Sequence, residues 1–293
     1  MAKLIQSRDA HVSLFQSAMD EVLARKSAET IRPDPEHPMV QMAAQPAVAG
    51  GVLNYCASLA KQYGEARLAG RTADANRLYA ELTQKMGDCD PAWVECAANY
   101  AAFLLSKQKT PYRVYQSIGD YVIGDRLPAN ARVAFVGDWG TGQDIAVKVL
   151  QQIARKDPDV VIHMGDVYYS GTEFEMQTYF YSIWAQTLDL NTVATYTLAG
   201  NHDMFCGGAP YYKLIDQLGQ PASYFCLRND DWQLIAMDTG LHDSDPVCAK
   251  PTYLESTELA WVSDKVHNAA ADAPCCFRTT SCFRPGNPSA VNP

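Results

Sequence analysis

The sequence has no excess of basic residues and no long apolar run. Its formal net charge is -9, whereas the phosphate backbone of a nucleic acid is held by an excess of Lys and Arg. No stretch approaches the roughly 18 apolar residues that cross a membrane. The first residues, MAKLIQSRDAHVSLFQ, lack the apolar core of a signal peptide. We therefore expect a cytoplasmic protein with neither a nucleic acid nor a membrane as partner.

The cysteines do not suggest a disulfide framework. There are nine of them, an odd number, and their spacing matches no paired metal-finger motif. This favours reduced thiols. The sequence also lacks a phosphate-cradling Gly-Lys-Ser motif and any Ser, Cys and His arrangement typical of a nucleophilic enzyme.

The hydrophobic pattern of the first part of the chain predicts a helical domain. Helical patterns cover residues 50–67, 72–86 and 90–106, after an apolar helical face from Val12 to Leu23 and a proline-rich break at 31–46. Asp90 can cap the open N–H groups at the start of the third pattern. Pro91 fits the first helical turn, where its missing N–H costs nothing. The run EARLAGRTADANRLYAEL resembles a tetratricopeptide-type hairpin. We expect a helical accessory domain over residues 1–115, with a packing role favoured over a partner-binding one.

The second part alternates strands and helices. RVAFVGDWGTG reads as a buried strand and turn, DIAVKVLQQIARK as a helix, and DVVIHMGDVYYSG as a second strand. VATYTLAGNHDMF repeats the strand design, and SYFCLR and WQLIAMDTG are two further strand candidates. These segments predict a parallel βαβ sheet, in which ligands gather at the carboxyl ends of the strands.

Three predicted strands end in polar residues. Their exits carry Asp138, then Asp166, and then the set Asn201, His202 and Asp203, each following a glycine. Hard oxygen ligands with one Asn and one His suit divalent or trivalent metals, and a shared carboxylate could bridge two ions. A single Gly-Asp after a strand is ordinary turn chemistry, but three in order favour a metal site.

The blocks GDWG, GDVYY and GNHD resemble the first three blocks of the calcineurin-like metallophosphoesterases. The Asp-x-Gly form of the first block and the tyrosine three residues after the second Asp are similar to the purple acid phosphatase branch. The resemblance covers roughly residues 130–270. It implies a metallophosphoesterase-type α/β (α+β) sheet sandwich over residues 116–273, behind the all-α domain.

The resemblance also implies roles for single residues. Asp138 and Tyr169 would bind one metal ion, Asn201 the second, and Asp166 would bridge both. His202 would give a proton to the leaving group, and Asp203 would hold its imidazole. The expected cofactors are two metal ions, with Fe(III) beside Zn, Mn or Fe(II), because a phenolate favours ferric iron.

The implied reaction is phosphoester hydrolysis with a metal-bound hydroxide as nucleophile. Its substrate would be a phosphorylated small molecule or protein, and the sequence does not choose between monoesters and diesters. The family pattern then requires a strand ending in His and a Gly-His-x-His block, and the sequence contains neither. We therefore expect impaired activity. The alternative is a non-catalytic scaffold that binds a partner through its helical domain.

The last stretch, residues 274–293, shows no hydrophobic period and holds three cysteines. We expect a disordered tail there, which leaves the domain C-terminally incomplete, with about five strands and exposed apolar sheet. A shift of reading frame would explain it. In the shifted frame, the third base of the Cys275 codon and the first two bases of the Cys276 codon can encode only Leu. One consistent choice of codons encodes Leu-Leu-Ser-His-His in that frame. The alternative is a genuine Cys-rich and Pro-rich tail.

Two other histidines are candidate site residues. His163 lies inside the apolar run VVIHMGD and is best interpreted as a buried histidine with a hydrogen-bond partner. His242 follows MDTG and could reach the mouth of the site, although a surface-loop role is favoured.

Overall fold

The computed structural model describes residues 49–87, 89–90, 92–243, 252–268 and 273–278. The described chain divides into two compact units between Ala101 and Ala102. This division lies earlier in the sequence than the expected position near residue 115. The predicted apolar face from Val12 to Leu23 lies outside the described residues. Each unit is considered by itself below.

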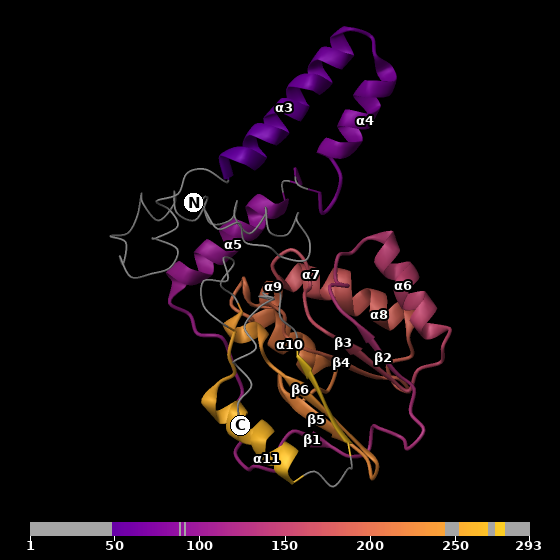
Figure 1. Cartoon of the computed structure of the whole chain (residues 1–293), viewed down its shortest axis with the longest axis vertical. Coiled ribbons are helices and arrows are strands. Elements are labelled where there is room, and N and C mark those ends of the chain that lie inside the picture. The colour runs from indigo at the N-terminus through magenta and orange to yellow at the C-terminus, as the bar shows by residue number, and fades with distance from the viewer. Residues whose placement is uncertain (1–48, 88, 91, 244–251, 269–272, 279–293) are drawn as a thin grey trace. The chain divides into compact units, whose positions relative to one another are not determined.

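The described part of unit one is helical, as predicted. It contains α3 (Ala49–Leu68), α4 (Thr72–Leu82) and the start of α5 (Ala92–Ser106) (Figure 1). Helices α3 and α4 form the expected hairpin. Among the hairpin side chains that the structure describes, the buried apolar ones are Leu59, Ala66, Ala75 and Leu78. A core of this size gives a two-helix unit little stability of its own.

Asp90 fastens the entry to α5 in the way that the sequence predicts. Its Oδ1 accepts a hydrogen bond from the backbone N–H of Ala92 at 3.0 Å, and its Oδ2 accepts one from Met86 at 2.8 Å. The carboxylate thus serves both the helix start and the preceding turn.

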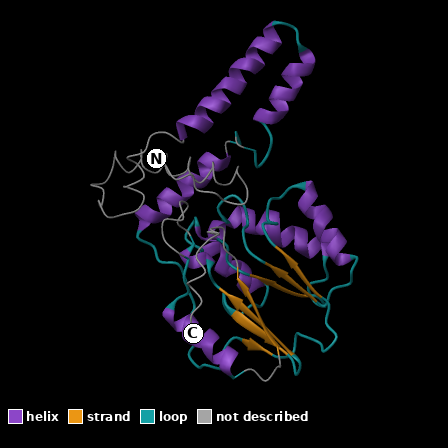
Figure 2. Ribbon diagram, viewed as in Figure 1, coloured by secondary structure: helices purple, strands orange, loops and turns teal. Residues whose placement is uncertain are grey.

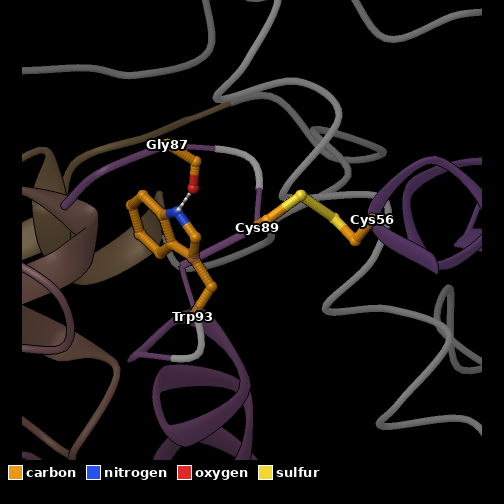
Figure 3. Close-up of a disulfide and its surroundings, with 4 residues drawn as sticks. All are labelled: Cys56, Gly87, Cys89 and Trp93. Atoms are coloured by element: carbon orange, nitrogen blue, oxygen red, sulfur yellow. Dashed lines mark hydrogen bonds between the residues drawn. A yellow bond between two sulfur atoms is a disulfide. The ribbon is translucent and has the colours of Figure 1, made fainter. Parts of the chain in front are cut away.

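A disulfide joins Cys56 of α3 to Cys89, with the two Cα atoms 5.7 Å apart (Figure 3). Beside it, the indole N–H of Trp93 donates to the carbonyl of Gly87 at 3.2 Å. The expectation of reduced thiols is therefore wrong for this pair. It failed because the two cysteines become neighbours only when the hairpin folds.

Unit two contains two β-sheets, drawn as arrows in Figure 2. The first sheet is parallel and has the order β2 (Val133–Val136), β3 (Val160–His163) and β4 (Ala194–Thr197). Its crossovers run through α6 (Asp144–Ala154), and through α7 (Glu173–Glu175), η1 (Met176–Tyr181) and α8 (Ser182–Thr187). The predicted βαβ design is confirmed.

The second sheet is mixed and has the order β1-β5-β6-β7. Its strands are β1 (Val122–Ile123), β5 (Phe225–Arg228), β6 (Trp232–Met237) and β7 (Ala273–Arg278). Only β5 and β6 run antiparallel. The remaining elements of unit two are α9 (Asn201–Met204), α10 (Ala209–Gln217), η2 (Gly240–His242) and α11 (Ser256–His267).

Alternating side chains bury both faces of each sheet. Ile162 of β3 and Leu227 of β5 belong to one core between the two sheets. Val161 instead packs with residues of α6, η1, α8 and α10 on the outer face of the first sheet. On the far side, Ile235 of β6 packs with Trp261 of α11. The unit is therefore a two-sheet sandwich with helices on both sides.

Two expectations about this sandwich are wrong. The structure has seven described strands rather than about five, and β1 and β7 bring a second sheet against the first. In addition, residues 274–278 of the supposed disordered tail pair with β6, with Leu234 opposite Cys275. The open edge of β6 supplies hydrogen-bond partners that a pattern search of the tail cannot see. Residues 279–293 lie outside the described residues.

No helix in the described ranges is both long enough and apolar enough to cross a membrane.

Candidate metal site at the strand exits

The predicted site residues follow three neighbouring parallel strands. Val136, His163 and Thr197 are in register across β2, β3 and β4. Asp138, Asp166 and Asn201 therefore leave the same edge of the sheet, as predicted. An isolated bridge between Gly140 and Val167 continues the pairing past the first two strands.

The backbone at two of these exits is left-handed. Asp138 has φ 53° and Asp166 has φ 73°, a region that non-glycine residues seldom occupy. The N–H of Asp138 donates to the carbonyl of Gly165 at 3.1 Å, which locks the first turn onto the second. Strained backbone of this kind gathers at functional sites.

Asp203 holds the loops together. One carboxylate oxygen accepts hydrogen bonds from the N–H groups of Gly200 at 2.7 Å and Asp166 at 2.9 Å, and the other accepts from Val167 at 2.9 Å. Burial raises the pKa of Asp203 to about 7, against the opposing effect of these three donors. These contacts of Asp203 position the site backbone, and its expected hold on the imidazole of His202 stays a prediction.

His202 is held by a different partner. Its Nδ1 lies 2.6 Å from the carbonyl oxygen of Tyr169, and its backbone N–H donates to Oδ1 of Asp166 at 3.0 Å. Because a carbonyl can only accept, Nδ1 carries the hydrogen, and Nε2 is the unprotonated nitrogen of the neutral ring. Burial lowers the pKa of His202 to about 4. A role as proton donor therefore requires Nε2 to be protonated against this burial.

Two carboxylates and a tyrosine meet above the first two strands. Tyr168 donates a hydrogen bond from its hydroxyl to Oδ1 of Asp138. Burial, the charges of Asp138 and Asp203 and a hydrogen bond to Asp138 together raise the pKa of Asp166 well above its usual range. Asp138 is exposed while Asp166 is buried. The pair thus opens to solvent on the Asp138 side.

The tyrosine that reaches Asp138 is not the one that the motif indicated. Tyr168 makes this contact, whereas Tyr169 follows it and uses its backbone N–H to bond Oε1 of Glu175. The expected role of Tyr169 as a ligand stays a prediction.

Asn201 is the third donor at the edge. Its side chain is 1% exposed, and neither Oδ1 nor Nδ2 has a hydrogen-bond partner among the described residues. An unsatisfied buried amide is costly. By residue type, its amide oxygen and the carboxylates of Asp138 and Asp166 are ligands that suit a hard cation.

This fit does not extend to a complete two-ion site. Within the described ranges, no group of three or more His, Cys, Asp or Glu side chains could hold a metal ion. The expectation of two ions of stated identity therefore goes beyond what these residues support.

Sequence reasoning missed the residue that braces the second loop. Glu175 Oε2 accepts hydrogen bonds from the N–H groups of Ser170 at 3.2 Å and Thr172 at 2.8 Å. Thr172 in turn accepts from the N–H of Glu175, which completes a capping box. The Thr-x-x-Glu spacing at 172–175 was the available signal.

His163 is buried as the sequence interpretation expected, but only one of its two ring nitrogens has a hydrogen-bond partner among the described residues, because Nε2 is buried without one. It is fully buried, and its Nδ1 lies 2.9 Å from the hydroxyl of Thr197. Burial lowers its pKa to about 3, so the ring is neutral in the core. It is not part of the donor set.

Comparison with known proteins gives one match. The family model described as calcineurin-like phosphoesterase matches residues 131–279. The matched segment covers the first sheet, the strand exits and β7, and so extends past the expected domain end at 273. No curated protein is similar enough to the chain to count as a match.

Proposed function

Because this chain belongs to the calcineurin-like phosphoesterase family, we propose that it hydrolyses phosphoesters at the edge formed by the exits of β2, β3 and β4. The observation that carries the proposal is the buried Asn201 amide, which has no hydrogen-bond partner among the described residues and leaves the same sheet edge as two carboxylates that share a hydrogen bond. Such a set is costly without a cation and favourable with one.

Asp138, Asp166 and Asn201 would hold the ion. When bound, it would supply positive charge for the phosphoryl oxygens and lower the pKa of water. Asp138 is exposed and Asp166 is buried, so an ion held by both would be reached by solvent through Asp138. Three finer features follow only from the resemblance to purple acid phosphatases. They are a second ion, the role of Tyr169 as a ligand of the first ion, and the presence of iron in the pair.

His202 would handle the proton of the leaving group. Its Nδ1 stays on the Tyr169 carbonyl, which directs Nε2 away from that loop. In the proposed reaction Nε2 carries the proton that the departing oxygen takes up. Asp203 contributes by fixing the backbone of Gly200 and Asp166, and so keeps the donors in place.

The second candidate function is a scaffold without catalysis. It is favoured by the lack, among the described residues, of any cluster of three His, Cys, Asp or Glu side chains able to hold a metal. In that case the helical unit would bind a protein partner and the sandwich would only support it.

Metal binding and hydrolysis of an aryl phosphate separate the two functions. We expect the full chain to bind Mn²⁺ and hydrolyse the ester, and Asp166→Asn to lose both. Asp230→Asn, an exposed turn residue, is the matched control and should retain both. A folded wild-type chain that binds no Mn²⁺, Zn²⁺ or iron and releases no phosphate would overturn the enzymatic proposal in favour of the scaffold.

A further inference from the structure

The exit of β6 reaches the metal site through backbone contacts. A Cβ added to Gly240 would lie 2.3 Å from the carbonyl oxygen of Ala199 and 2.7 Å from that of Gly200. A Cβ on Gly200 would in turn lie 2.2 Å from Oδ1 of Asp166. Gly200 is thus packed between the β6 exit and a proposed metal ligand. The backbone of the β6 exit therefore borders the site at Gly240.

His242 and Tyr253 form a stacked pair on this loop. Their ring centroids are 3.9 Å apart, with 13° between the planes. Nε2 of His242 lies 2.8 Å from Oε1 of Glu255, which fixes the imidazole from its edge. Tyr253 is 55% exposed although its neighbour is largely covered. One face of the phenol ring is therefore supported, and much of the residue remains open to solvent.

The chain connection keeps His242, and so the ring stacked on it, close to Gly240. His242 is two residues after Gly240, so their Cα atoms are at most about 8 Å apart. The nearby side chains are acidic: Glu255 contacts His242, and Asp243 accepts a hydrogen bond from Thr252 at 2.8 Å. These carboxylates disfavour a phosphate group at this place. The exposed ring suits the organic part of the substrate.

We propose that Tyr253, backed by His242, is a specificity-determining residue that binds the leaving group of aromatic phosphoesters. The inference rests on the proposed function, since it needs the phosphoryl group at the metal site. A tyrosine ring held by stacking loses little conformational freedom when a second ring stacks on it. A flat aromatic leaving group therefore gains more from this surface than an alkyl group of similar charge.

The test compares two non-hydrolysable ligands, phenylphosphonate and methylphosphonate, by equilibrium binding to the Mn²⁺-loaded full chain. We expect the wild type to prefer the phenyl ligand by about two- to tenfold. Tyr253→Leu should abolish the preference and leave methylphosphonate binding unchanged, whereas Tyr253→Phe should keep it. Trp232→Leu removes an exposed aromatic residue at the other end of β6 and should keep it as well.

Each other result has one meaning. Equal binding of the two phosphonates by the wild type, or an unchanged preference in Tyr253→Leu, overturns the aromatic subsite and leaves the proposed function standing. Failure of the wild type to bind either phosphonate overturns both. A preference lost equally in Trp232→Leu would also contradict the assignment to Tyr253.

Discussion

The hydroxyl of Tyr168 donates a hydrogen bond to Oδ1 of Asp138 and so joins the exits of β2 and β3. Replacing the tyrosine with Phe removes the donor and keeps the ring. We expect Tyr168→Phe to unfold more easily by about 1 kcal/mol and to weaken Mn²⁺ binding, because Asp138 loses its orientation. Denaturant unfolding and metal titration measure the two effects. Unchanged metal affinity would show that Asp138 is oriented by other contacts.

Gly200 leaves no room for a side chain beside Asp166. In Gly200→Ala the new Cβ would lie 2.2 Å from Oδ1 and 2.6 Å from the backbone N of Asp166, so the two loops must separate. We expect a loss of about 1–3 kcal/mol in unfolding free energy and a loss of metal binding. Gly124→Ala is the matched control, since a Cβ there meets nothing within 4 Å. Equal behaviour of the two variants would refute the close packing.

The Cys56–Cys89 disulfide should dominate the stability of the hairpin. The cysteines are 33 residues apart in sequence, and closing a loop of that size stabilises by about 3–4 kcal/mol in the chain-entropy model. We expect Cys56→Ser to lose the helical signal of unit one at a lower temperature, as followed by circular dichroism. A reductant should lower the unfolding temperature of the wild type to that of the variant and leave the unfolding temperature of the variant unchanged. A wild-type chain indifferent to reductant would contradict this.

Glu258 should make the stability of unit two depend on pH. Its carboxylate is buried, accepting hydrogen bonds from the hydroxyl of Tyr112 at 3.0 Å and the N–H of Asp238 at 2.8 Å. Burial, with the charge of Asp238, raises its pKa from 4.5 to about 8. The folded state therefore binds the proton more tightly than the unfolded state. The stabilisation is complete below about pH 4.5 and is lost as the pH rises toward 8.

Thermal unfolding of the wild type and Glu258→Gln between pH 5 and 8 measures this effect. Over this pH range the unfolding free energy of the wild type should fall by up to a few kcal/mol more than that of the variant, because Gln cannot ionise. Parallel pH profiles for the two proteins would argue against a raised pKa.

The sequence was most informative where a local pattern and a topology rule agreed. Apolar runs predicted β2, β3 and β4, and parallel pairing then placed Asp138, Asp166 and Asn201 on one edge. The roles of Tyr168 and Asp203 were not predictable in this way. They depend on how two loops cross, and spacing along the chain carries no information about that.

Short or paired elements were missed for a related reason. β1 has two residues, too few for a periodic signal, and β7 forms because β6 offers an open edge. The disulfide likewise depends on a fold that brings Cys56 to Cys89.

The frameshift hypothesis for residues 274–293 stays a prediction. β7 forms from the residues as written, so packing of residues 275–278 does not require the shifted frame. The nucleotide sequence across the codons for 268–293 tests it directly. A template without a Leu-Leu-Ser-His-His reading one base upstream would end the hypothesis.

The cross-link between Cys56 and Cys89 also fixes how far the chain can be drawn out. Fully extended, the 33-residue separation would span about 110 Å, but the bond keeps the two Cα atoms at 5.7 Å. Under a stretching force, the oxidised chain would therefore lengthen by about 100 Å less than the reduced one. The hidden length would be released in a single step when the bond is reduced.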